Sequence, residues 1–373
     1  MDEERICRMA LSLIPGIGTI TANRLIETVE SAAWLFRHRG ELADIEGMPS
    51  KLVKALDHPE ILDRCEAEMK FAETNRIACL ISSDPEYPAR LRECPDAPLV
   101  LFYRGNVDLN RPRVISVVGT RRMTDYGRSL CTSLARELKA MAPDVIVVSG
   151  LAYGVDITMH LAALDNGLDT IGVLAHGLDR IYPSPHRATA AKMLEQGGLV
   201  TEFPSRTNPD KQNFVMRNRI IAGMADATVV VQSAKKGGAL ITASLASGYN
   251  RECFAVPGRV GDEYSEGCNW LIRSNQANLM ECAEDLMNAM NWERAESASA
   301  KLPRQGELFP PADEEEAKVI SLIKEQEEGM SLASLCVETG MKVNKLLAML
   351  TSLEIRGLVR ACAGGIYRSG WGA

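Results

Sequence analysis

Short apolar runs, each ending near glycine or another small residue and followed by a helix-like stretch, recur through the middle of this 373-residue chain. The runs are Val114–Val118, Val145–Val148, Thr170–Leu174, Thr228–Val231 and Cys253–Val256. Continuous apolar strands that alternate with helices are typical of a parallel sheet covered by helices on both faces. The pattern therefore predicts an α/β domain built on such a sheet.

The residues that follow these runs indicate what the domain binds. In open α/β sheets, ligands bind beyond the carboxyl ends of the strands, where helix N-termini present free N–H groups to anions. Glycine at a strand end lets the backbone approach a phosphate closely. Gly119, Gly150, Gly177, Gly237 and Gly258 follow the five runs. This edge of the sheet is predicted to bind a phosphate or a nucleotide backbone.

The chain divides into four predicted segments. Residues 1–76 are expected to form a helical domain of the helix-hairpin-helix or SAM-like kind, and residues 77–291 the α/β domain. Polar residues with serine and proline over 292–312 indicate a linker. Residues 313–373 are expected to form a winged helix, with three helices and a hairpin that closes on Gly364–Gly365.

Each flanking domain leaves its role open. Two glycine turns occur in the N-terminal part, Leu13–Gly18 and the weaker Ala43–Met48. Such a turn can hold a nucleic-acid phosphate at the following helix, or it can serve packing and protein contacts. The candidate recognition helix of the winged helix, Val343–Arg356, carries scattered cations and no dense basic face. DNA reading and protein contact are both compatible with it.

Composition restricts the classes of function. The net charge of -7 excludes a surface that attracts polyanions everywhere, so any nucleic-acid contact must come from a local cluster of Arg and Lys. The N-terminus has acids where a signal peptide needs cations, and a cytoplasmic protein is expected. The 10 cysteines and 5 histidines show no metal-ligand spacing. Neither a metal nor a cofactor is expected.

The segment Lys211–Gly223 carries the sharpest chemical signal. Lys211, Arg217 and Arg219 fall within nine residues that contain no acid, and Phe214 lies between them. Cations that track phosphates beside a ring that stacks on a base are typical of single-strand binding. The alternative is that both arginines pair with carboxylates and that Phe214 belongs to the core. The candidate partners are Asp156, Glu202 and Asp226.

Two further basic elements follow strand ends. Arg121 comes directly after Gly119–Thr120, and Lys235 precedes Gly237–Gly238 at the end of a later run. Because the carboxyl ends of parallel strands meet at one edge, these cations are expected near Lys211–Gly223. For Arg121 the alternative is a structural ion pair.

Six motifs occur in the order seen in the DprA/Smf DNA-processing family, which this chain resembles over roughly residues 80 to 285. They are Gly119–Arg121 with Tyr126–Gly127, Ser149–Asp156 with His160, Gly177–Pro183, Glu202–Pro204, Phe214–Gly223, and Phe254–Gly258 with Gly267–Ile272. The helical and winged-helix flanks also resemble that family's accessory domains.

The resemblance implies an extended Rossmann-like fold and a homodimer that binds single-stranded DNA, protects it and loads RecA recombinase during natural transformation. It implies a phosphate pocket at Arg121 and the Ser149–Gly150 turn, backbone contacts from Lys211 and Arg217, and base stacking on Phe214. No catalytic residue is implied. The residues predicted to bind DNA are Gly119, Thr120, Arg121, Ser149, Gly150, Lys211, Phe214, Arg217, Asn218, Arg219, Lys235, Gly237 and Gly238.

The chain departs from the family pattern at Gln232–Ser233, where Glu-Ala is common. The main alternative function is a nucleotide hydrolase of the lysine-decarboxylase-like group, which shares this type of fold. Its sites place a glutamate just after a glycine-rich loop, and the comparable stretch here, Gly237–Ser244, has no acid. A dinucleotide-dependent dehydrogenase is weaker still, because the glycine fingerprint with its later acid does not occur.

Overall fold

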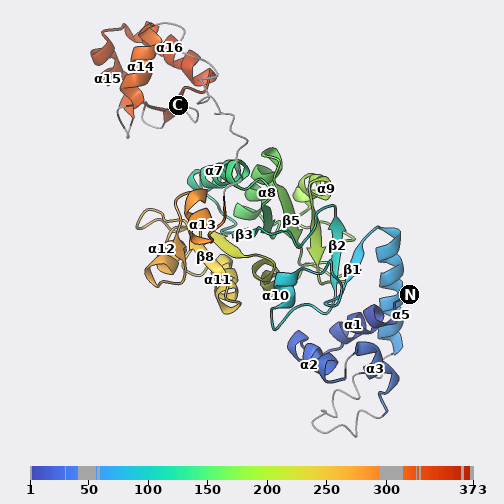
Figure 1. Cartoon of the computed structure of the whole chain (residues 1–373). Coiled ribbons are helices and arrows are strands. Elements are labelled where there is room, and N and C mark those ends of the chain that lie inside the picture. Colours follow the sequence, from blue (N-terminus) through green and yellow to red (C-terminus); the bar gives the residue numbers. More distant parts are fainter. Residues whose placement is uncertain are drawn as a thin grey trace. The chain divides into compact units, whose positions relative to one another are not determined.

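The structure is a computed structural model of the 373-residue chain, and it divides into two compact units, residues 1–295 and 296–373 (Figure 1). The residues described are 2–29, 31–40, 56, 59–293, 314–324, 326, 329–362 and 365–369.

A nine-stranded sheet forms the centre of the first unit, in the order β1-β2-β6-β5-β4-β3-β7-β8-β9. The strands from β6 to β9 pair in parallel, whereas β1 and β2 add an antiparallel extension beside β6. This confirms the predicted fold class. The strands are β1 (Ala78–Leu80), β2 (Leu101–Gly105), β3 (Val114–Val118), β4 (Ile146–Ser149), β5 (Asp169–Val173), β6 (Gly197–Thr201), β7 (Ala227–Val230), β8 (Glu252–Ala255) and β9 (Asn278–Leu279).

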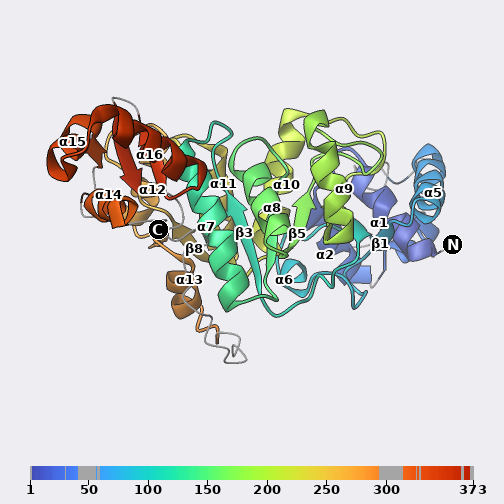
Figure 2. The same cartoon turned by 90° about the horizontal axis from the view of Figure 1, so that it is seen from above.

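Helices cover both faces of this sheet (Figures 1 and 2). Alternate residues of β3 enter two different cores, Val114 and Val118 on one face and Ile115 and Val117 on the other. Helices α6, α10, α11 and α12 pack on the first face, and α7, α8, α9 and α13 on the second. Their bounds are α6 (Ala89–Arg92), α7 (Asp125–Met141), α8 (Val155–Asp165), α9 (Arg187–Glu195), α10 (Lys211–Gly223), α11 (Gly238–Gly248), α12 (Glu266–Arg273) and α13 (Ala283–Ala289).

The chain reverses its direction across the sheet at β3. From β3 it runs outward through β4 and β5 to β6, and α10 then returns it to β7 on the other side of β3. The loops that follow β3 and β7 therefore leave the sheet in opposite directions. This is the switch point at which open α/β sheets bind their ligands.

Among the described residues, four helices precede the sheet and share a core of their own with β1 and β2: α1 (Glu3–Leu13), α2 (Thr19–Val29), α3 (Ala32–Arg37) and α5 (Pro59–Thr74). The first glycine turn joins α1 to α2, with Gly16 at a φ of 88°. The second, Ala43–Met48, lies outside the described residues. Buried Glu68 of α5 accepts hydrogen bonds from Ser205 N at 2.7 Å and Ser205 Oγ at 2.6 Å. These bonds fix the helices to the segment that leads into α10.

The second unit has the three helices and the hairpin that the sequence predicts for a winged helix. Its antiparallel sheet has the order β10-β12-β11. The predicted linker lies mostly outside the described residues. No helix in the described part of either unit is long and apolar enough to cross a membrane. The elements are α14 (Glu314–Lys324), β10 (Met330–Ser331), α15 (Leu332–Thr339), α16 (Val343–Ile355), β11 (Val359–Cys362) and β12 (Ile366–Ser369).

Candidate nucleic-acid interface

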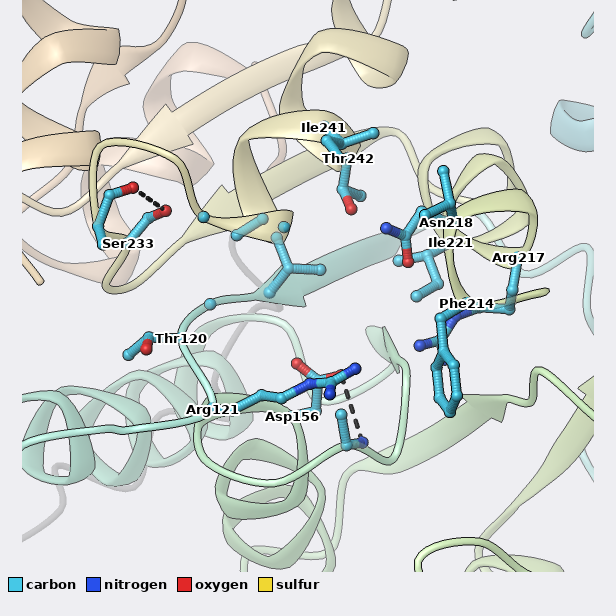
Figure 3. Close-up of a pocket in the computed structure, with 18 of the residues that line it drawn as sticks. Thr120, Arg121, Asp156, Phe214, Arg217, Asn218, Ile221, Ser233, Ile241 and Thr242 are labelled. Carbon is cyan, nitrogen blue, oxygen red and sulfur yellow. Dashed lines mark hydrogen bonds between the residues drawn. The ribbon is translucent and has the colours of Figure 1, made fainter. Parts of the chain in front are cut away.

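A cavity of about 560 Å³ opens at the switch point (Figure 3). The loop after β3 forms one wall and one face of α10 the opposite wall, while the loop after β7 and the first turn of α11 close the third side. The N-terminus of α11, at Gly237 and Gly238, lines this cavity. A helix N-terminus combined with glycine favours an anion there.

Backbone contacts hold the β3 loop in place. Thr120 N donates to Gln232 O at 2.7 Å, and Thr120 O accepts from Val155 N at 3.2 Å. Gly154 adopts a φ of 78°, and a Cβ at that position would run into Thr120 O. Only glycine therefore allows the start of α8 to approach the β3 loop this closely. Arg121 projects from a fixed backbone.

Gln232 fastens the other end of the same loop. Its side chain is buried, its Oε1 accepts from Thr124 N at 3.1 Å, and its Nε2 donates to Thr124 Oγ1 at 2.8 Å. Thr124 in turn caps α7 by accepting from Gly127 N at 3.3 Å. A carboxylate could not donate the second of these bonds. Gln232 thus supports the loop from behind and does not line the cavity.

A buried guanidinium joins α10 to the ends of two strands. Arg217 is 3% exposed, and its Nη1 donates to Gly150 O at 2.7 Å and also to Val173 O. Asp156 accepts from Gly150 N at 3.2 Å and from Ala152 N at 3.4 Å. Arg217 and Asp156 thereby fix the loop after β4 from both of its sides.

Burial shifts the pKa values of both charged groups. It lowers the pKa of Arg217 to about 10, because the charged form loses its water, while the nearby Asp156 charge opposes this. Arg217 thus stays charged at neutral pH. Burial raises the pKa of Asp156, and the Arg217 charge opposes that shift in turn. Each group makes the other's charge tolerable inside the protein.

The ring of Phe214 lies at the cavity wall, half-buried, and belongs to none of the hydrophobic clusters formed by the described residues. Arg121 Cζ lies 5.3 Å from the centre of this ring, and Arg217 Cζ lies 5.8 Å from it. Figure 3 shows Arg121 reaching across the cavity toward Phe214. Cations at these distances are attracted to the ring electrostatically.

The accessible charge of the cavity is positive. Arg121 and Lys211 are exposed, and neither forms an ion pair within the part of the chain that the structure describes. Asp156 is the one carboxylate among the described lining residues, and it is buried. An anion that enters this cavity meets two free cations.

The cavity brings together most of the residues that the sequence predicted to bind DNA. The predicted residues that line it are Gly119, Thr120, Arg121, Lys211, Phe214, Arg217, Asn218, Gly237 and Gly238.

The other predicted residues lie elsewhere. Arg219 is buried and pairs with Glu202, one of the carboxylates considered as its partner. Ser149 is buried and donates to Val117 O at 2.6 Å, while Gly150 acts through its backbone. Lys235 lines a neighbouring hollow beside Trp270.

Ile241 and Thr242, which were not predicted from the sequence, also line the cavity, from the first two turns of α11. The glycine pair just before them is the signal that could have identified these turns, since the helix begins at Gly238.

Comparison with known proteins gives a family for most of the chain. The model of the DNA recombination-mediator protein A family matches residues 78–291, and that of the DprA winged helix domain matches residues 303–365. The putative DNA processing protein DprA of Mycobacterium tuberculosis is 32% identical, over 97% of this chain and 90% of its own length. Protein Smf of Escherichia coli is 36% identical, over 78% of this chain and 77% of its own length.

Two solved structures share the fold. DNA processing protein A of Streptococcus pneumoniae superposes with a TM-score of 0.59 at 28% identity, covering 77% of this chain and 98% of that one. DNA processing protein A of Helicobacter pylori, whose structure concerns its single-stranded DNA binding mode, has a TM-score of 0.52 at 28% identity. This match covers 58% of this chain and 96% of the Helicobacter pylori chain.

Replacement of Arg217 should lower the stability of the fold more directly than it lowers ligand binding. In Arg217→Ala two buried strand-end carbonyls lose their donor and Asp156 loses the positive charge beside it, so the free energy of unfolding should fall by about 3–5 kcal/mol. Urea unfolding followed by tryptophan fluorescence measures this. Arg121→Ala, which removes an exposed guanidinium from the same cavity, is the matched control and should unfold almost as the wild type does. Equal stability of the two variants would contradict a structural role for Arg217.

Proposed function

The chain belongs to the DNA recombination-mediator protein A family, and from this membership together with the cavity we propose that it binds single-stranded DNA. The observation that carries the proposal is the accessible ring of Phe214 beside the unpaired cation Arg121, in a cavity that opens at a helix N-terminus. The Helicobacter pylori relative, whose single-stranded DNA binding mode has been described, supports the same ligand class.

Each part of the cavity has a role in this proposal. Arg121, Lys211 and the backbone at Gly237–Gly238 take phosphates, and Phe214 stacks on a base. A base in a duplex is paired and stacked on its neighbours, so its face cannot reach such a ring, whereas an unpaired base can turn toward it. The site should therefore prefer single strands. Asn218, one residue beyond Arg217, offers an amide to the same ligand.

We infer that the protein acts by binding and not by catalysis. Asp156, the acid that lines the cavity, is buried and accepts two backbone hydrogen bonds from its own loop. Burial and the Arg217 charge account for its perturbed pKa without any catalytic task. The proposed outcome of binding is protection of the strand and delivery of RecA recombinase to it. A homodimer would present two such cavities to one strand.

Removal of either free cation should weaken binding at every sequence. Arg121→Ala and Lys211→Ala each delete one phosphate contact, so the slope of log affinity against log salt should become shallower by roughly 0.7. Fluorescence anisotropy with a labelled oligothymidine at several salt concentrations measures the slope. Arg136→Ala, an exposed arginine of α7 that lines neither this cavity nor its neighbours, should leave the slope unchanged. A slope of wild-type size in either cavity variant would remove that cation from the site.

The variant Phe214→Ala tests whether the Phe214 ring stacks on a base or packs in the hydrophobic core. Loss of stacking should weaken single-strand binding by about 1–3 kcal/mol and leave the unfolding midpoint nearly unchanged. Loss of a core ring would instead cost about 3–5 kcal/mol of folding stability. Anisotropy and urea unfolding on the same protein give both values. Phe214→Tyr keeps the ring and should bind as the wild type does. Unchanged binding by a stable Phe214→Ala protein would leave only the electrostatic part of the site.

Delivery of RecA recombinase should depend on the same cavity. On single strands already coated by a single-strand-binding protein, the wild-type chain should shorten the lag before RecA begins DNA-dependent ATP hydrolysis. Arg121→Ala should lengthen this lag again, because the strand is held less well, and Arg136→Ala should not. A lag that the wild-type chain does not change would contradict recombinase loading while leaving single-strand binding intact.

A further inference from the structure

A second cavity, of about 390 Å³, is lined in part by the segment that follows β5. Arginines from three elements surround it: Arg104 of β2, Arg180 of the segment itself and Arg187 at the start of α9. Leu194 and Leu199 are among the aliphatic residues of its floor. An aliphatic floor together with guanidinium groups suits a ligand that has both an apolar body and negative charge.

The protein neutralises only part of the positive charge around this cavity. Arg104 and Arg187 are exposed and form no ion pair within the described ranges. Asp179 is the one acid among the described lining residues. Its carboxylate already accepts from Arg180 Nη2 at 3.0 Å and from Arg206 N at 2.9 Å. Two arginines are left with their charge facing solvent, which is an open position for phosphates.

Two exposed tyrosines are adjacent in sequence to residues that line the two cavities. Tyr182 directly follows the lining residue Ile181, is 48% exposed, and its ring centre lies 6.0 Å from that of Phe214 in the first cavity. Tyr153 is also 48% exposed and meets the ring of His186 edge-on at 4.8 Å. His186 immediately precedes Arg187 of the second cavity. The contact of Tyr182 with Phe214 thus links the first cavity to the segment that lines the second.

The segment that carries these rings is anchored on both sides. Tyr182 N donates to His176 Nε2 at 3.2 Å, and His186 Nδ1 donates to Leu151 O at 2.8 Å. Burial lowers the pKa of His176, so its ring stays neutral and keeps an acceptor nitrogen for Tyr182 N. Arg180 Nη1 also donates to Asn208 Oδ1 at 3.2 Å, just before α10. The rings are therefore held in place before any ligand arrives.

We propose that the second cavity is a further subsite for the same single strand, reached from Phe214 across Tyr182. Arg104 and Arg187 bind phosphates there, and the aliphatic floor holds a base or a deoxyribose. This inference rests on the proposed single-strand binding, and it extends the binding path from one cavity to two, toward α9 and β2. It also gives exposed Tyr182 a function: it supports the base that passes between the two cavities.

A length series of oligothymidines tests this path. Wild-type affinity should rise in two stages as the strand lengthens within the roughly 4–16 nucleotides that single-strand sites cover, first when the strand fills the first cavity and again when it reaches the second. The double variant Arg104→Ala/Arg187→Ala should match the wild type on the shortest strands that bind. On long strands it should lose the second rise, and its salt slope should be shallower by roughly 1.4, two contacts at 0.7 each.

Single variants at two positions, Arg187 and Tyr182, guard against effects on the fold. Arg187→Ala alone, at the exposed first residue of α9, should show about half of the loss in salt slope. Tyr182→Ala should weaken long strands about fivefold or more, as expected for one lost stacking contact, and Tyr182→Phe should bind as the wild type does. The control is Arg128→Ala/Arg136→Ala, which removes two exposed arginines of α7 that line neither cavity.

The outcomes separate this inference from the proposed function. The second subsite would be overturned if the double variant bound long strands with the affinity and the salt slope of the wild type. It would also be overturned if the double variant lost affinity equally for short and long strands. If Arg121→Ala and Phe214→Ala bind normally while the double variant loses long strands, the first site is wrong and the second stands. A wild-type protein that binds no strand of any length would overturn both.

Discussion

The buried guanidinium of Arg217 is the interaction on which the carboxyl edge of the sheet depends. One side chain from α10 holds the ends of β4 and β5 through Gly150 O and Val173 O. A buried charge of this kind is costly unless it is hydrogen-bonded, so the contact with Gly150 O holds the loop after β4 in place. Phe214 lies one helical turn before Arg217, and its ring is therefore placed at the cavity wall by the same anchor.

The cations of this edge divide into two groups according to burial. Arg217 and Arg219 are buried and donate their hydrogen bonds to groups inside the protein. Arg121 and Lys211 are exposed, so their donors are accessible to a ligand. A chain with a net charge of -7 can attract a polyanion at this edge because the exposed local charge is positive even though the total is not. The two buried arginines make this edge of the sheet rigid. The two exposed cations attract an anionic ligand, and salt will screen this attraction.

The antiparallel extension of the sheet gives the protein more than additional core. β2 supplies Arg104 and β6 supplies Leu199, which border the second cavity beside α9. If the single strand follows the path proposed here, the binding surface spans both the parallel sheet and its extension. Glu68 fixes the N-terminal helices to Ser205, in the segment that leads into α10.

The sequence by itself determined the parallel sheet, its switch-point edge and the winged helix. Strands such as Val114–Val118 are buried on both faces, so their nearly continuous apolar pattern predicts them from the sequence alone. β6 was not predicted, because two consecutive glycines, Gly197 and Gly198, are more typical of a loop than of a strand. In the structure Thr170 O and the Tyr103 ring approach these two residues so closely that only glycine fits. Tertiary structure alone decided which cations face a ligand. Burial of a charge depends on carbonyls and carboxylates dozens of residues away, and spacing along the chain does not encode them.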